Sequence, residues 1–252
     1  MRYNRGLTGM DSGVRFVAAI SWAVLLAGCG ARGDAPVLLF NGAGTSPNDV
    51  RAIESILRGE RLDYARVSSA QLIGMSEDEL RRHRLLIVPG GNFEAMGKGL
   101  AAGTAGRVRG AVEGGLNYLG VCAGAFLAGN APYNGLNLTG GVRFGFYSAE
   151  ARGIRKAAVA ISGADGEKLE QYWEDGPQLD GWGAVVARYP DGTAAVVQGA
   201  VGQGWVVLSG VHPEAPAGWR RGMAFTTPAE QANAYAARLI RAALHRETLP
   251  HF

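Results

Sequence analysis

The chain has 252 residues, of which 47% are hydrophobic, and this composition supports one sizeable core and falls short of what two large domains need. The formal net charge is +3, and no run rich in lysine and arginine carries interleaved aromatic residues. Nucleic acid is therefore not an expected partner.

Residues 1–28 are predicted to be an export signal. Arg2, Arg5 and Arg15 precede an apolar run over residues 16–26, which is too short to span a bilayer and suits the hydrophobic core of a signal peptide. The leader holds these three arginines and one aspartate, so its removal lowers the formal charge from +3 to +1. We therefore expect a nearly neutral mature protein.

The end of this leader, Leu26-Ala27-Gly28-Cys29, resembles a bacterial lipobox. The resemblance implies cleavage before Cys29, lipidation of its thiol, and a lipid-anchored, periplasm-facing protein of the bacterial cell envelope. Gly30 in place of an aspartate favours the outer membrane. Residues 29–36 are then a short tether and residues 37–252 a single domain. The alternative is an ordinary signal peptide with a coincidental cysteine.

Apolar runs typical of buried strands alternate with helical segments in the first half of the chain. Strands are expected at residues 37–40, 62–67, 85–88 and 116–121. Helices are expected to start at Ser46, with Pro47 and the acid Asp49 in the first turn, and to include residues 77–83 and 108–112. This alternation favours a doubly wound α/β fold with a mainly parallel sheet.

The second half holds short strand candidates separated by Gly, Asp and Pro turns, which indicates antiparallel strands that extend the sheet. They lie at residues 142–146, 157–161, 168–173, 184–189, 194–197 and 205–208. Residues 228–245 carry apolar side chains at helical spacing, and this apolar face is expected to belong to the core.

The segment Gly120-Val121-Cys122-Ala123-Gly124 follows an apolar run and has the G-x-[SC]-x-G pattern of a nucleophile elbow. We expect the flanking glycines to permit strained backbone dihedrals that expose the thiol, and a following helix to favour the thiolate. With Cys29 lipidated, Cys122 is the only free thiol, which is unusual in an exported protein. The alternative is a buried cysteine that acts as a small hydrophobic residue.

A base and its orienting group are expected at His212 and Glu214, just past the strand at residues 205–208. The carboxyl ends of parallel strands meet at one edge of a sheet, so these side chains should converge on Cys122. Alternate residues of an extended chain point the same way, which would direct His212 and Glu214 into one site.

Backbone donors for an oxyanion are expected at Gly91, in the motif Pro89-Gly90-Gly91, and at Ala123, directly after the cysteine. The alternative for the Pro-Gly-Gly motif is a simple turn.

Weaker candidates for a substrate-lining role are Gly90, Asn92, Tyr172, Trp173, Trp182 and Arg220. Arg220 is a candidate for binding a substrate carboxylate in bidentate fashion, although loop arginines seldom do so, and the tryptophans are more typical of a core or a hairpin. The other histidines show no metal-ligand spacing, so we expect neither a metal nor a cofactor.

Taken together, the Pro-Gly-Gly motif, the segment around Cys122 and the segment Gly210-Val211-His212-Pro213-Glu214 resemble the class I glutamine amidotransferase-like superfamily. The nearest likeness is to the domain at the N-terminus of biotin-protein ligases, in a stand-alone bacterial form. The resemblance implies a flavodoxin-like three-layer α/β/α fold. It also implies Cys122 as nucleophile, His212 as base, Glu214 as orienter, and Gly91 and Ala123 as oxyanion donors.

The sequence departs from the family in two respects. It holds no biotin-ligase catalytic segment up to Phe252, so biotin ligation is not expected. An exported lipoprotein would also lack the synthetase partner and the ATP that an amidotransferase needs. We therefore expect a cysteine hydrolase of the amidase or peptidase type that acts on a small molecule or peptide. The alternative is a non-catalytic binding or structural module, and the oligomeric state stays open.

Overall fold

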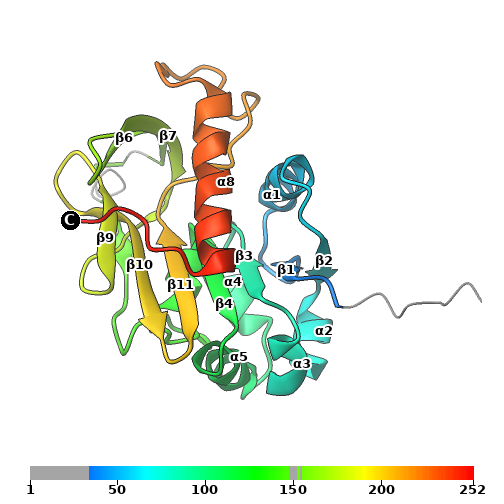
Figure 1. The fold of residues 1–252 in the computed structure, drawn as a ribbon. Coiled ribbons are helices and arrows are strands. Elements are labelled where there is room, and N and C mark those ends of the chain that lie inside the picture. The colour runs from blue at the N-terminus through cyan, green and yellow to red at the C-terminus, as the bar shows by residue number, and fades with distance from the viewer. Residues whose placement is uncertain (1–33, 148–151, 154) are drawn as a thin grey trace, which may run out of the picture. The chain divides into compact units, whose positions relative to one another are not determined.

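A computed structural model describes residues 34–147, 152–153 and 155–252 (Figure 1). The described chain forms one compact unit from Asp34 onward. The predicted signal peptide and the lipobox with Cys29 lie outside the described residues. Within the described ranges, no helix has both the length and the hydropathy needed to cross a membrane.

One half of the main sheet is parallel, and it confirms the flavodoxin-like α/β fold that the sequence predicts. The sheet has nine strands in the order β2-β1-β3-β4-β11-β10-β9-β6-β7, and the first five pair in parallel. All residues of β1, β3 and β4 are buried, as expected for strands covered on both faces. The parallel strands are β2 (Tyr64–Val67), β1 (Val37–Phe40), β3 (Leu85–Val88), β4 (Asn117–Val121) and β11 (Gly204–Ser209).

The other half of the sheet is antiparallel, as predicted for the second half of the chain. From β11 it continues through β10 (Ala194–Val201), β9 (Ala184–Arg188), β6 (Lys156–Gly163) and β7 (Lys168–Glu174). The strand expected at residues 142–146 is shorter than predicted. Only β5 (Gly145–Phe146) forms there, and it pairs with β8 (Pro177–Gln178) outside the main sheet.

Helices cover both faces of the sheet, and two clusters of buried hydrophobic residues fill the two interfaces. One cluster packs α1 (Pro47–Gly59) and α8 (Ala229–His245) on the sheet. The other packs the remaining helices on the opposite face, which completes the three layers. These are α2 (Ser69–Gly74), α3 (Glu77–Arg81), α4 (Phe93–Lys98), α5 (Thr104–Glu113) and α6 (Ala123–Ala128).

Two of the short helices, α2 and α4, were not predicted from periodicity, and each has only six residues. Side-chain caps specify their starts. Ser68 and Gln71 form a reciprocal capping box on α2, and the Asn92 side chain accepts the backbone N–H of Ala95 in α4. Six residues show too little of the helical period to reveal an apolar face.

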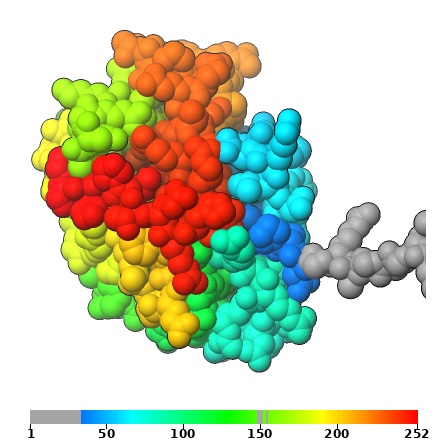
Figure 2. All heavy atoms as spheres, viewed as in Figure 1, coloured from blue at the N-terminus to red at the C-terminus, as the bar shows by residue number. Residues whose placement is uncertain are grey.

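The segment after α8 lies across the antiparallel strands and appears in red in Figure 2. The Gln198 side chain in β10 bonds both the N–H and the C=O of Leu249, and the N–H of Phe252 donates to the C=O of Val185 in β9. These contacts attach the C-terminal segment to the antiparallel half.

The strand order reverses at β1, because β2 lies on one side of β1 and β3 on the other. In sheets of this type, ligands bind outside the carboxyl ends of the strands at such a switch point. Asp49, Gly90, Cys122 and His212 all follow the carboxyl ends of parallel strands. The fold therefore brings four distant parts of the sequence to one edge.

Candidate active site

Cys122 occupies the sharp turn between β4 and α6, in the strand–turn–helix arrangement that the sequence predicts. Its backbone has φ 49° and ψ −105°, a conformation that is strained for a residue with a side chain. The Cys122 N–H donates to the C=O of Ser209 at the end of β11, at 2.8 Å. The neighbouring strand therefore helps to hold the strained turn.

The expected role of the two flanking glycines is wrong in one respect. Neither Gly120 nor Gly124 has a positive φ, so the strain lies on Cys122 itself. The glycines instead permit close packing: a Cβ on Gly124 would lie 2.0 Å from the C=O oxygen of Val88, and one on Gly120 would meet the backbone of Gly124. The thiol was expected to be exposed, but Cys122 is buried and only 6% accessible.

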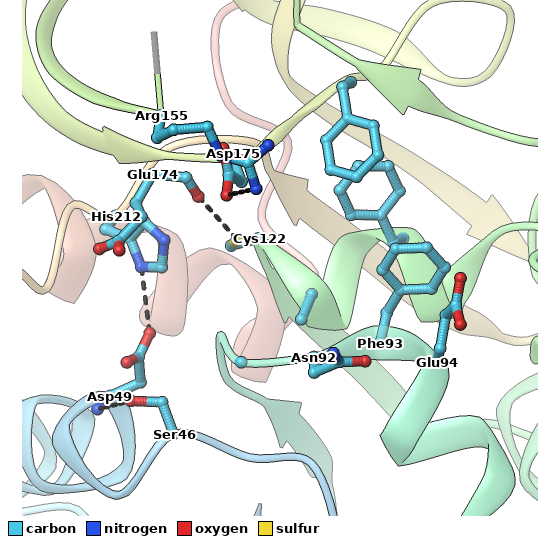
Figure 3. A pocket seen from close by; sticks show the side chains of 14 residues that line it. Ser46, Asp49, Asn92, Phe93, Glu94, Cys122, Arg155, Glu174, Asp175 and His212 are labelled. Carbon is cyan, nitrogen blue, oxygen red and sulfur yellow. Dashed lines mark hydrogen bonds and ion pairs between the residues drawn. The ribbon is translucent and has the colours of Figure 1, made fainter. Parts of the chain in front are cut away.

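His212 lies beside two buried carboxylates. Its Nδ1 is 3.0 Å from Glu214 Oε1, as predicted, and 3.1 Å from Asp49 Oδ1. Figure 3 shows the imidazole ring between Asp49 and Cys122. Nδ1 carries one hydrogen and can donate to one carboxylate at a time, so Asp49 and Glu214 compete for the same donor.

The charges around His212 favour its protonated form. Burial opposes the positive charge, but the charges of Cys122 and Glu214 and the hydrogen bond with Asp49 outweigh burial and raise the pKa of His212 well above its ordinary value. An imidazolium beside the Cys122 sulfur stabilises a thiolate. The six-residue helix α6 contributes a weaker field than a long helix.

The two carboxylates have different surroundings. Glu214 lies beside a small apolar gap lined by Ile53, Leu119 and Ile240, and burial raises its pKa. Its Oε2 has no hydrogen-bond partner among the described residues. Burial also opposes ionisation of Asp49, but its hydrogen bond and charge interaction with His212 hold the pKa of that carboxyl below its usual range.

Gly90 is required for packing, a role that differs from the predicted contact with substrate. A Cβ at this position would lie 2.1 Å from Asp49 Oδ1 and 2.7 Å from His212 Cε1. Only a residue without a side chain leaves room for the Asp49 carboxylate to reach the imidazole.

The Cys122 thiol has a second neighbour besides His212. Its Sγ donates to the backbone C=O of Glu174 at 3.5 Å, across the pocket from β7 (Figure 3). This bond stabilises the protonated thiol and is lost when the proton moves to His212. Formation of the thiolate therefore has to overcome a competing contact from the antiparallel half.

A pocket of about 380 Å³ opens at Cys122. Cys122, His212 and the expected residues Gly91, Ala123 and Asn92 all contribute to its lining. The backbone N–H groups of Gly91 and Ala123 donate to no other backbone group within the described ranges, which leaves them available to a ligand. The other lining residues are Ser46, Asp49, Phe93, Glu94, Phe126, Phe146, Arg155, Glu174 and Asp175.

Of the six predicted substrate-lining residues, Asn92 alone belongs to this lining, and Gly90 lies outside it beneath Asp49 and His212. Trp173 is fully buried in the core, where its ring meets that of Tyr147 edge-on. Trp182 packs against Gly199 in β10. Arg220 is mostly buried, donates to the C=O of Thr227 and covers the ring of Phe225, so its guanidinium supports a loop.

Tyr172 also lies outside the pocket lining, but it contacts His212. Its ring meets the His212 ring edge-on at 5.8 Å, and its C=O accepts the N–H of His212 at 2.8 Å. Burial raises the pKa of Tyr172 well above its ordinary value, so its hydroxyl stays protonated and donates to the Glu174 carboxylate.

The cluster of Asp49, His212 and Glu214 is also the one place in the described part of the chain where ligand atoms are grouped closely enough for a metal ion. These atoms lie within 4.8 Å of one another, and all three residues are buried. A metal at Nδ1 would have to replace the hydrogen that the carboxylates accept. The expectation that the protein uses no metal stays a prediction.

Sequence reasoning placed Asp49 only as an acid in the first turn of a helix. A signal was nevertheless present, because Asp49 precedes Ile53 by four residues and therefore lies on the apolar face of α1. An acid on a buried face needs a partner, and here the partner is His212. The aromatic residues of the pocket come from three separate elements and gave no comparable signal.

Residues 35–158 match the family described as "Biotin-protein ligase, N terminal". The match includes Cys122 and ends before His212. None of the curated proteins matches the sequence significantly.

Several solved structures share the fold. A polyextremophilic β-galactosidase from the Antarctic haloarchaeon Halorubrum lacusprofundi is 17% identical, with a TM-score of 0.53 over 83% of this chain and 30% of that chain. A cold-adapted β-galactosidase from Rahnella sp. R3 is 15% identical, with a TM-score of 0.50 over 84% of this chain and 32% of its own. This chain thus spans about a third of either enzyme, and these likenesses show the fold alone.

A smaller protein aligns along almost its whole length. This protein, a putative GMP synthase subunit from Thermoplasma acidophilum, is 12% identical, with a TM-score of 0.47 over 84% of this chain and 96% of that chain.

Proposed function

We propose that this chain is a cysteine hydrolase of the amidase or peptidase type, with Cys122 as nucleophile and His212 as its base. The observation that carries the proposal is the strained Cys122 turn beside an imidazole that two buried carboxylates hold, in a pocket large enough for a small molecule or peptide end. Strain and buried charge both destabilise a fold, and both are typical of active sites.

In the first half of the proposed reaction, His212 accepts the thiol proton and the thiolate attacks the substrate carbonyl carbon. A carbon–sulfur bond forms while the carbonyl π electrons move to the oxygen. The N–H groups of Gly91 and Ala123 stabilise this oxyanion. As the carbonyl reforms, the carbon–nitrogen bond breaks, and the imidazolium gives its proton to the departing amine.

In the second half, a water molecule attacks the acyl-enzyme while His212 takes a proton from it. The carbon–sulfur bond then breaks, which releases a carboxylic acid and returns the cysteine to its starting state. The protons and electrons balance with water as the only co-reactant, so the chain needs neither ATP nor a redox partner. Asp49 and Glu214 stabilise the imidazolium in both halves.

We also propose that the chain carries the biotin-protein ligase N-terminal domain and belongs to the class I glutamine amidotransferase-like superfamily. The family match over residues 35–158 supports the first part. The position of His212 and Glu214 after β11, at the same sheet edge as Cys122, supports the wider grouping.

The lipid anchor at Cys29 and a location in the bacterial cell envelope, on the outer membrane and facing the periplasm, belong to the same proposal. Its test is metabolic labelling with a fatty-acid analogue in the native cell type. We expect Cys29→Ser to abolish the label and to move the protein from the membrane fraction to the soluble fraction. A label that persists in this variant would contradict the anchor.

The test of the hydrolase is a panel of amides, peptides and activated esters offered to the purified full chain. A Cys29→Ser background leaves Cys122 as the only thiol. We expect Cys122→Ala to reduce cleavage of every substrate by about 10³-fold or more, and chelators to have no effect. Substrates cleaved equally fast by Cys122→Ala would overturn the proposal.

A second candidate function is a binding module that keeps the elbow without turnover. The bond from the Cys122 thiol to the Glu174 carbonyl favours this alternative, because it stabilises the unreactive form of the sulfur. Acyl-enzyme formation separates the two proposals, because only the hydrolase forms this intermediate. A binding module would retain ligand affinity in Cys122→Ser and show no acyl-enzyme by mass spectrometry with activated esters.

A further inference from the structure

Three phenylalanine rings from separate elements form a cluster that we call the aromatic wall: Phe93 at the start of α4, Phe126 in α6 and Phe146 in β5. The centroids of the Phe93 and Phe126 rings are 4.7 Å apart, and those of Phe126 and Phe146 are 4.9 Å apart. All three line the pocket. Each ring therefore contacts another ring and also borders open space.

Phe146 is unusual because it is 43% exposed. Large hydrophobic side chains are otherwise well covered in the described part of the chain, where only Tyr133 and Phe252 are also exposed. Those two lie outside the pocket lining, and each is covered by one cation. Covering an exposed ring inside a pocket with an apolar ligand group removes apolar surface from water and so makes the free energy of binding more favourable.

The aromatic wall lies next to the proposed oxyanion donors. Phe126 follows Cys122 by four residues in α6, and Phe93 follows Gly91 by two. Figure 3 shows Phe93 on the side of Cys122 away from His212 and Asp49. In the proposed reaction the leaving group must lie near His212, which gives it a proton. The wall therefore faces the other part of the substrate, the acyl group.

We infer that the aromatic wall is an acyl-side subsite that selects substrates with an aromatic or bulky apolar group next to the scissile carbonyl. The inference rests on the proposed function in one respect, because it takes Cys122 as the nucleophile. Planar apolar groups fit the wall, since aromatic rings pack on one another in stacked or tilted geometry. Short acyl groups leave Phe146 uncovered and bind more weakly.

The test uses two alkylating ketones that differ only in the acyl-side group, benzyl chloromethyl ketone and methyl chloromethyl ketone. Both place a carbonyl at the oxyanion donors, and neither requires turnover. The full chain with Cys29→Ser is labelled, and mass spectrometry follows modification of Cys122. We expect the benzyl reagent to react about tenfold faster, after division by the rates with free N-acetylcysteine.

Phe146→Ala should lower this preference about threefold or more, because it removes the exposed ring of the wall. Phe252→Ala is the matched control, since it removes an exposed phenylalanine ring outside the pocket, and it should leave the preference unchanged. If the benzyl-to-methyl rate ratio, divided by the same ratio for N-acetylcysteine, is near one in the chain without a phenylalanine substitution, the inference is wrong. A preference equally strong in Phe146→Ala would also overturn it.

These outcomes are separate from the failure of the hydrolase proposal. If no amide or ester is cleaved in a Cys122-dependent manner, the proposed function fails, yet a benzyl preference that depends on Phe146 still establishes the subsite. If cleavage occurs but acetyl and phenylacetyl esters of one alcohol react equally well, the hydrolase stands and the subsite is wrong.

Discussion

The parallel and the antiparallel halves of the sheet contribute differently to the site. The parallel half supplies the groups that we propose to react, because Asp49, Cys122 and His212 follow β1, β4 and β11. The antiparallel half supplies part of the opposite wall, with Glu174 at the end of β7 and Asp175 directly after it. The halves differ in what they must hold fixed: the atoms proposed to react need positions set by buried strands, whereas the β7 side of the pocket can vary around them.

The two halves meet at His212. The backbone N–H of His212 donates to the C=O of Tyr172 in β7, and the His212 side chain points to Asp49 in α1. The antiparallel half also reaches the nucleophile through the bond from the Cys122 thiol to the Glu174 carbonyl. The proposed chemistry of the parallel half therefore depends on contacts from the other half, and substitutions can separate the two contributions.

The largest expected effect comes from the two carboxylates on His212. Because one Nδ1 hydrogen serves both, either can replace the other, and we expect Asp49→Asn or Glu214→Gln alone to lower kcat/KM by about tenfold at most. The double variant should lose about 10³-fold, more than the product of the single losses. Steady-state kinetics on the best ester substrate would measure this.

The same variants should move the pH profile in a fixed direction. Each carboxylate favours the imidazolium and raises the pKa of His212, so its removal lowers that pKa. The alkaline limb of kcat/KM, where the imidazolium loses its proton, should therefore move to lower pH in each single variant and further in the double variant. Glu54→Gln is the control, since it alters a buried acid of α1 outside the pocket. If the loss of kcat/KM in the double variant equals the product of the two single-variant losses, the two carboxylates do not share one role.

A further prediction concerns stability and compares a glycine packed against the parallel strands with a glycine in β5, outside the main sheet. A Cβ on Gly124 would clash with the C=O of Val88, so Gly124→Ala should lower the free energy of unfolding by about 3 kcal/mol. Gly145 in β5 has open space around its Cβ position, and Gly145→Ala should change stability by less than about 0.5 kcal/mol. Urea denaturation of both variants gives the comparison. Equal stability would show that α6 can move away from β3.

The sequence predicted the parallel half better than the pocket wall, for physical reasons. Strands buried on both faces leave continuous apolar runs, and the turn at Cys122 carries a local glycine pattern. Asp49 was missed because the requirement for it comes from His212, more than 160 residues away. Phe146 is positioned by pairing between the two-residue strands β5 and β8, and this pairing is set by tertiary contacts that no local pattern records.

Among the acids of the pocket, Glu174 tests the electrostatic part of the comparison. Asp49, Glu94, Glu174 and Asp175 line the pocket together with the cations Arg155 and His212, so acids outnumber cations. An anionic reagent should enter less readily than a neutral one of the same size. We expect iodoacetate to alkylate Cys122 several-fold more slowly than iodoacetamide, relative to their rates with a free thiol.

Glu174→Gln should bring this ratio about threefold closer to that of the free thiol, because it removes one negative charge beside the sulfur and leaves the backbone C=O in place. Added salt should reduce the difference between the two proteins, since screening weakens the field in an open pocket. Asp78→Asn removes an exposed charge from α3, outside the pocket lining, and should have no effect. If Glu174→Gln and Asp78→Asn change the ratio equally, access to Cys122 depends on the net charge of the protein and not on Glu174. The two halves of the sheet would then not differ in their electrostatic contribution to the pocket.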